Sequence, residues 1–138
     1  MDRKSNSKGL IIAATVALLA VGTAWAGSEL RLQTRLKGSR AAAGQLSGKA
    51  TFENRLDRAR RKFSVEIERA KAGDMFDVMV SGVVVGTILV DNLGIGELDY
   101  DDTADGNDAD QRFPRNFPEL DGGEVVQVGP LTGTLQLK

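Results

Sequence analysis

The sequence predicts an all-β protein, an antiparallel β-sandwich of about seven or eight strands that follows a cleaved N-terminal signal helix. Three observations favour this fold. Apolar and polar residues alternate in segment after segment, glycine-containing turns recur about every ten residues, and only residues 55–61 have any helical tendency. That stretch is too short to form a stable helix by itself. Short strands at regular spacing favour a sandwich over a closed barrel.

The alternation assigns the strands and their core faces. In a strand with one face on the core and the other in water, every second side chain is apolar. This pattern occurs in residues 30–36, 49–53, 62–68, 76–80 and 131–137. We therefore expect the following residues to share the inward face of their strands: Leu30, Leu32, Thr34, Leu36, Ala50, Phe52, Phe63, Val65, Ile67, Phe76, Val78, Val80, Leu131, Leu135 and Leu137.

Residues 75–100 predict a three-stranded antiparallel meander. The dipeptide Ser81-Gly82 separates two apolar runs and indicates a tight hairpin. Residues 91–94, Asp-Asn-Leu-Gly, tolerate positive φ and indicate a second turn. The run 83–85 consists of three valines, so we expect this middle strand to be covered on both faces.

The N-terminus has the three parts of a secretory signal peptide, which we place at residues 1–26. Three basic residues within the first nine precede the apolar run 10–21, and Ala24 and Ala26 supply the small residues of a cleavage site. The apolar run is 12 residues long, whereas a helix that spans a bilayer needs about 20. We therefore expect only transient contact with a membrane.

The expected mature chain, residues 27–138, is a single β-sandwich domain that is secreted or periplasmic. A chain of this size can bury an independent core. The sequence contains no cysteine. The domain therefore has no disulfide, although export would permit one.

Charge is divided unevenly along the chain. Residues 30–71 carry 12 Lys or Arg and 4 Asp or Glu, whereas residues 72–138 carry 3 and 13. Such a split can indicate a half that binds polyanions. It also arises when basic and acidic strands lie side by side in one sheet and their charges pair across the strands. We expect the second arrangement.

A basic cluster lies at the centre of the positive half. It could grip an anionic polymer, but it has no interleaved aromatic residue on which a base could stack, and we exclude nucleic acid as a partner. Charges that flank an apolar strand commonly protect it from aggregation, and we expect that role here. The cluster consists of Arg55, Arg58, Arg60, Arg61 and Lys62.

Residues 101–122 lack strand periodicity, and an irregular connection of this length in a compact domain is either functional or disordered. Its acidic start is the candidate metal site, because hard oxygen ligands at alternate positions suit Ca²⁺. Residues 101–106 resemble the opening of an EF-hand loop, although Arg112 stands where that loop has its bidentate glutamate. The alternative is a solvated loop that keeps a sheet edge soluble. The candidate ligands are Asp99, Asp101, Asp102, Asp105, Asp108 and Asp110.

Two Phe-Pro pairs follow the acidic stretch, at Phe113-Pro114 and Phe117-Pro118. They could form a recognition segment for another protein. Aromatic residues in a loop more often attach the loop to its own domain, and proline stiffens the approach. We expect the second role.

Several classes of active site are excluded by composition. The chain contains no histidine, which excludes Ser-His-Asp and Cys-His sites and nearly excludes zinc and copper centres. The segment Gly94-Ile95-Gly96 lacks the third glycine of a phosphate-binding loop. Paired carboxylates could hydrolyse glycosides, but a small sandwich without tryptophan offers little cleft for a sugar. We expect no enzymatic activity, and Ca²⁺ is the one cofactor left open.

Much of the chain resembles small secreted β domains of environmental bacteria. The resemblance rests on the hairpin FDVMVSGVVVGTILV, the strand GIGEL, the Asp-rich loop and the closing segment GGEVVQVGPLTGTL, and it covers most of residues 45–137. These motifs consist of structural glycines and core valines. The resemblance therefore implies the fold and no activity or site.

Together these features predict an exported, non-enzymatic β-domain with a structural or surface-interaction role in the cell envelope or outside the cell. We expect its partner to be a protein or a component of the envelope or matrix. The alternative is a Ca²⁺-dependent binding module that uses the acidic loop at residues 99–110.

Overall fold

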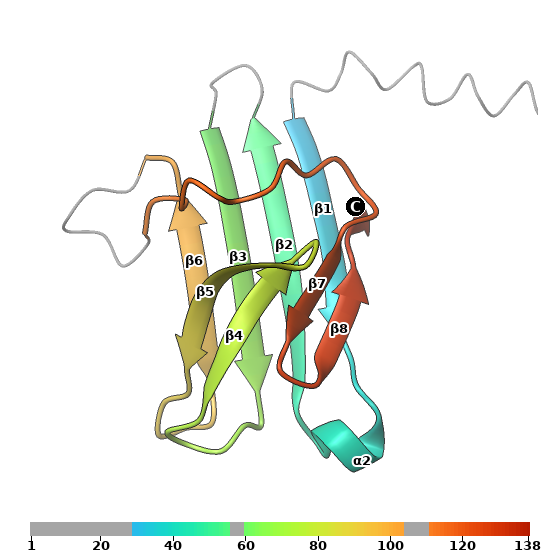
Figure 1. Cartoon of the computed structure of the whole chain (residues 1–138), viewed down its shortest axis with the longest axis vertical. Coiled ribbons are helices and arrows are strands. Elements are labelled where there is room, and N and C mark those ends of the chain that lie inside the picture. The colour runs from blue at the N-terminus through green and yellow to red at the C-terminus, as the bar shows by residue number, and fades with distance from the viewer. Residues whose placement is uncertain (1–28, 56–59, 104–110) are drawn as a thin grey trace, which may run out of the picture.

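A computed structural model of the chain describes residues 29–55, 60–103 and 111–138. Two antiparallel sheets face each other and enclose the core, which confirms the predicted β-sandwich (Figure 1). The predicted signal peptide at residues 1–26 lies outside the described residues. The elements in chain order are β1 (Glu29–Leu36), α2 (Arg40–Ala43), β2 (Ser47–Arg55), β3 (Arg60–Glu68), β4 (Met75–Val80), β5 (Val83–Leu89), β6 (Gly96–Asp101), β7 (Val125–Val128), β8 (Leu131–Thr134) and β9 (Gln136–Leu137).

The larger sheet, which we call sheet A, has five strands in the order β6-β3-β2-β1-β9. Sheet B has four strands in the order β5-β4-β7-β8. The chain changes sheet after β3, after β5, after β6 and between β8 and β9. The first and last described strands, β1 and β9, are neighbours in sheet A.

The core lies between the sheets, as the alternation of apolar residues predicts. Phe52 and Phe63 are opposite each other in the register, and both are buried. Of the residues that we expected to face inward, these are buried: Leu32, Leu36, Ala50, Phe52, Phe63, Val65, Ile67, Val78, Val80, Leu131 and Leu135. Leu30, Thr34 and Phe76 are half-buried, and Leu30 and Phe76 pack against the core.

Leu137 differs from this expectation, because its side chain is 72% exposed. The strand to which it belongs, β9, is the short edge strand of sheet A. The chain passes from sheet B to sheet A at Leu135, which is buried between the two sheets. Leu135 therefore fills the core at this corner, and Leu137 lies beyond it at the rim.

The predicted meander at residues 75–100 is only partly correct. Strands β4 and β5 form the expected hairpin around Ser81 and Gly82, which have φ of 51° and 80°. Strand β6, however, crosses to sheet A and pairs with β3. The turn at residues 91–94 makes this crossing, and the Asp91 carboxylate accepts hydrogen bonds from the N–H groups of Leu93 and Ile95. Alternation of apolar residues indicates which face of a strand is buried but not which strand lies beside it, and opposite charge on β3 and β6 favours the pairing observed.

Two further local expectations are wrong. Val84 is 47% exposed, because β5 lies in a sheet whose outer face is in contact with water. The short helix α2 was not expected; Ser39 precedes it as the N-cap, and the Ser39 hydroxyl accepts a hydrogen bond from the N–H of Ala42. Of the stretch 55–61, the described residues Arg55, Arg60 and Arg61 belong to strands.

In the described part of the chain no helix has the length and apolar character needed to cross a membrane.

Candidate functional site on the outer face of sheet A

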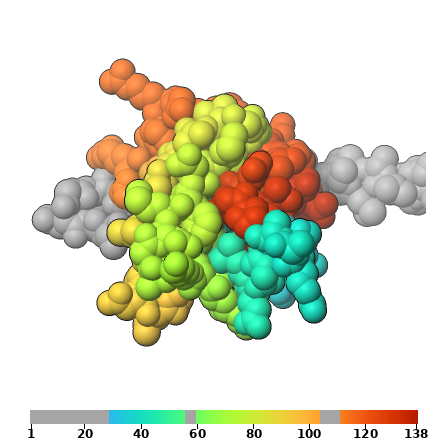
Figure 2. Space-filling model, turned by 60° about the horizontal axis from the view of Figure 1, so that its bottom comes forward, coloured from blue at the N-terminus to red at the C-terminus, as the bar shows by residue number. Residues whose placement is uncertain are grey.

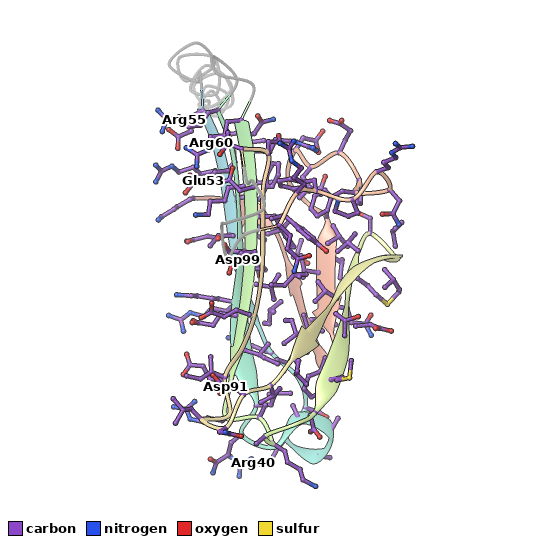
Figure 3. The ribbon with its side chains drawn as sticks, turned by 90° about the vertical axis from the view of Figure 1, so that its left-hand side faces the viewer. Arg40, Glu53, Arg55, Arg60, Asp91 and Asp99 are labelled. Carbon is purple, nitrogen blue, oxygen red and sulfur yellow. The ribbon has the colours of Figure 1, made fainter. Side chains whose placement is uncertain are left out.

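The outer face of sheet A carries most of the polar groups that could make a site. Alternate residues of its strands point away from sheet B, and Figure 3 shows Glu53, Arg55, Arg60 and Asp99 projecting from this face. Antiparallel register places these residues in rows across the strands. One row consists of Arg31, Glu53, Lys62 and Asp101, and the next consists of Gln33, Thr51, Ser64 and Asp99.

The first of these rows alternates in charge from strand to strand. Arg31 and Lys62 flank Glu53, and Asp101 lies beyond Lys62 on β6. Opposite charges on neighbouring strands stabilise a sheet, whereas like charges directly opposite each other destabilise it. The positive strand β3 thus lies beside the negative strand β6, which confirms that the two charged halves of the sequence meet within one sheet.

A hollow of about 390 Å³ opens on this face over β2 and β3. Its lining combines two hydroxyl groups, one carboxylate and three cationic side chains: Thr51, Glu53, Arg55, Arg60, Lys62 and Ser64. A second hollow of about 830 Å³ lies toward the β8–β9 edge and shares Thr51 with the first. The two hollows make the outer face of sheet A an uneven polar surface.

Asp101 is the one charged or polar residue that is buried in the described part of the chain. Its carboxylate accepts hydrogen bonds from Arg60, from Nε at 3.3 Å and from Nη2 at 2.7 Å. The N–H and the hydroxyl of Thr103 also donate to it, each at 2.9 Å. The hydrogen bond from Arg60 is the main reason that the pKa of Asp101 lies far below its usual range, against the opposing effect of burial.

Asp102 pairs with Arg61 in the same manner. The Arg61 guanidinium donates to both carboxylate oxygens, at 2.9 and 3.2 Å, and the backbone N–H of Arg61 donates at 3.1 Å. The guanidinium carbon of Arg61 also lies 4.2 Å from the centre of the Phe113 ring, a cation–π contact. Consecutive arginines on β3 therefore hold consecutive aspartates at the end of β6.

These pairs bear directly on the predicted metal ligands. Asp101 and Asp102 are bound to arginines, and Asp99 accepts a hydrogen bond from the Ser64 hydroxyl at 2.5 Å. No group of three acidic side chains suited to a metal forms among the residues described. The remaining predicted ligands lie outside them: Asp105, Asp108 and Asp110.

The basic cluster is also placed, except for Arg58, which lies outside the described residues. Arg60 and Arg61 make the pairs described above. Arg55 lies beside Glu29, with Nη1 3.9 Å from the carboxylate. The sequence does contain a signal for the pairing of β3 with β6: two consecutive arginines, Arg60-Arg61, match two consecutive aspartates, Asp101-Asp102, of opposite charge. No comparable signal in the sequence shows that Thr51, Glu53 and Ser64 line the hollow, because their proximity depends on the register of β2 against β3.

The Phe-Pro segment attaches to the domain, as expected. The Phe117 ring is buried and meets the Phe63 ring edge-on, with 5.0 Å between centroids. Phe113 stacks edge-on against Phe117 at 4.8 Å and also contacts Tyr100. The Tyr100 hydroxyl donates to the carbonyl of Val85 at 2.5 Å, so this residue joins sheet A to sheet B.

No family model matches the chain, and no curated protein has a similar sequence. The chemistry of the site must therefore be inferred from its own groups. Charged side chains and hydroxyls on two neighbouring strands can recognise a ligand through hydrogen bonds and charge complementarity.

Proposed function

We propose that this protein is an exported, non-enzymatic β-domain that binds a protein or another component of the cell envelope or its surroundings through the outer face of sheet A. The observation that carries the proposal is the hollow over β2 and β3, where cationic, acidic and hydroxyl groups from two strands converge. Fixed charges of both signs favour selection of a partner by its charge pattern.

The position of the hollow supports a binding role. Its side chains stand on β2 and β3, two inner strands of a five-stranded sheet, which hold them more rigidly than a loop would. Thr51 and Ser64 are directly opposite each other, so their hydroxyls lie side by side between the charged residues. An extended polar ligand could lie along this row and contact both strands.

Export and the absence of catalysis remain part of the proposal. Export rests on the N-terminal segment, and the absence of catalysis rests on the composition. The carboxylates of Asp99, Asp101 and Asp102 also favour a structural role over a catalytic one, because each accepts a hydrogen bond from a side chain within the domain. A catalytic acid or base needs a proton that it can exchange with a substrate.

The test compares two double variants with the same change in charge. Arg55→Gln/Lys62→Gln removes two cations from the hollow, and Arg112→Gln/Arg115→Gln removes two from the exposed segment after the acidic loop. Binding to envelope preparations of the producing cells is measured by co-sedimentation over a series of salt concentrations. We expect the first variant to bind more weakly and with a smaller salt dependence than the wild type. Equal binding by the two variants, or no binding by the wild type, would overturn the proposal.

A Ca²⁺-dependent module is the second candidate. It is favoured by the density of carboxylates at residues 99–110, where mutual repulsion would be relieved by a divalent cation. Such a cation would compete with Arg60 and Arg61 for Asp101 and Asp102. The two candidate functions therefore differ in one respect: only the second predicts that Ca²⁺ changes the stability of the domain.

A further inference from the structure

Strand β5 forms one edge of sheet B, and its sequence, VVVGTIL, has neither a charged residue nor a proline (Figure 1). Proteins usually protect an edge strand with lysine, proline or a covering segment, because an open edge can pair with another strand. Two of the other edges have such contacts, and the third, β9, is only two residues long. The β6 edge receives Gln111 in a bridge to Tyr100, and Thr132 of β8 bridges to Lys37.

Hairpin geometry defines which backbone groups of β5 point outward. Residues 81 and 82 both have positive φ, as in a type I′ turn, so Val80 and Val83 form the hydrogen-bonded pair that closes the hairpin. At the other end, the N–H of Val90 donates to the carbonyl of Asp74. Peptide groups alternate in direction along a strand, so Ile88, two residues before Val90, also points its peptide groups toward β4. The peptide groups of Thr87 and Leu89 therefore point away from β4. The register shift opposite Val78 lies nearer the hairpin turn and does not change this assignment.

The two halves of this edge differ. In the first half, the carbonyl of Val84 accepts from the Asn116 side chain at 3.3 Å, and the carbonyl of Val85 accepts from the Tyr100 hydroxyl at 2.5 Å. In the second half, the structure gives no hydrogen bond within the described ranges to the outward peptide groups of Thr87 and Leu89. This half of the edge is therefore open.

The side chains beside the open half are apolar. Leu89 is 63% exposed and lies directly opposite Met75, which is 66% exposed. In Figure 2 the β4–β5 hairpin, coloured lime to yellow, forms an outer surface beside the red β7–β8 hairpin. An apolar patch adjoining an open strand edge is the arrangement that strand addition requires.

We propose that the open half of β5 pairs with the same strand of a second copy. The two strands would run antiparallel about a twofold axis at Ile88, with Thr87 of each copy opposite Leu89 of the other. This register uses both outward residues of each strand and joins the two four-stranded sheets into one.

Charge favours a second copy as the occupant. Antiparallel pairing about a twofold axis places a segment against itself, so any charged residue would approach a like charge. Strand β5 has no charged residue; Asp91 follows it by two positions, and Asp77, on β4, accepts from the Thr87 hydroxyl at 3.3 Å. In the dimer the two β5 strands would separate β4 from its counterpart by about 14 Å, three spacings of about 4.8 Å. At this distance salt screens the repulsion between the two Asp77 side chains.

The first experiment is sedimentation velocity of the exported protein over a wide range of concentrations. We expect a concentration-dependent equilibrium between monomer and dimer. Leu89→Lys should abolish the dimer, because an edge lysine blocks strand addition, and Thr87→Pro should do so by removing an outward N–H. Leu137→Lys is the matched control, since it changes an exposed leucine on the edge strand of sheet A. Thermal melts should show that all three variants remain folded.

The register is tested by cross-linking, which the absence of native cysteine makes clean. Thr87→Cys and Leu89→Cys are purified separately and then mixed under oxidising conditions. We expect a disulfide-linked dimer in the mixture and little in either sample alone, because residues two positions apart along paired strands exceed the reach of a disulfide. A wild type that stays monomeric at every concentration, or a control that loses the dimer as Leu89→Lys does, would overturn the proposal. Binding of β5 to a different protein without self-association would also overturn it.

Discussion

The Arg60 guanidinium holds the buried Asp101 carboxylate at two points, with the shorter contact at 2.7 Å between Nη2 and Oδ2. This pair joins the first residue of β3 to the last residue of β6. The pair lies where β6 ends and the irregular connection at residues 101–122 begins. The stability of that end of sheet A therefore depends on the ionised form of Asp101.

Asp101→Asn should lower the free energy of unfolding at pH 7 by about 1.5–3 kcal/mol, the usual value of hydrogen bonds to a charged group. Because the pKa of Asp101 is lowered in the folded state, its contribution is present above the unfolded pKa of about 3.9 and is lost as the pH falls through the folded value. Urea unfolding of the wild type and the variant should thus converge at low pH. Glu119→Gln, at an exposed carboxylate, should leave stability within about 0.5 kcal/mol of the wild type.

Phe63→Ala should be among the most damaging substitutions in the domain. Its ring is fully buried and contacts Phe117, so truncation should cost about 3–5 kcal/mol through lost burial and the cavity that remains. Phe76→Ala should cost less, about 1–3 kcal/mol, because Phe76 is half-buried. Chemical denaturation measures both. Equal losses would mean that Phe76 is more deeply packed than the structure indicates.

Tyr100→Phe tests the hydrogen bond that joins sheet A to sheet B. Without the hydroxyl, the carbonyl of Val85 loses its donor, which should cost about 1–3 kcal/mol. Burial raises the pKa of Tyr100, so this contribution is present below the unfolded pKa of about 10 and is lost as the pH rises through the folded value. Melting temperatures of the variant and the wild type at neutral pH provide the comparison. Thr87→Val is the control: it removes an exposed hydroxyl that donates to Asp77, and it should change the melting temperature little.

Calcium should raise the melting temperature if the acidic segment binds it. Stabilisation by a ligand that binds only the folded state follows RT ln(1 + [L]/Kd), about 1.4 kcal/mol at tenfold excess over Kd. Melts in excess EDTA and in excess CaCl₂ measure the shift, and Asp105→Ala should remove it. Superimposable curves for the wild type would contradict Ca²⁺ binding and leave the proposal for the outer face of sheet A untouched.

Cleavage of residues 1–26 can be tested by fluorescence, since the only tryptophan of the chain is Trp25. The exported protein should show tyrosine emission alone, and its intact mass should match residues 27–138. Excitation near 295 nm should give almost no signal. Tryptophan emission from membrane-bound protein of full-length mass would instead identify the segment as an anchor.

The sequence predicted the sandwich because one physical signal, alternation of apolar and polar residues, repeats in β1, β2, β3 and β4. Phe63, Val65 and Ile67 illustrate it, since each is buried and each is flanked by polar residues. Alternation states which face is buried but not which strand is the neighbour. The partner of β6 depends on long-range pairing with Arg60 and Arg61, and this is where the predicted meander was wrong.

The candidate site was less predictable than the fold for the same reason. The basic cluster and the acidic stretch were both visible in the sequence, but their mutual pairing requires β3 and β6 to be adjacent. The hollow depends on the register that places Thr51 opposite Ser64. A slip of either strand by one residue would have turned its hydroxyl toward the core and separated the pair.

The pairing of β1 with β9 affects when the domain can fold during synthesis. The earliest described strand does not acquire its second neighbour until residues 136–137 have been made. Sheet B likewise needs β7 and β8, which are also late in the chain. Contacts between residues so distant in sequence form slowly. The sandwich therefore cannot be completed before residues 136–137 are available, and such late completion would fit the proposed export, in which a chain crosses the membrane while it is still extended.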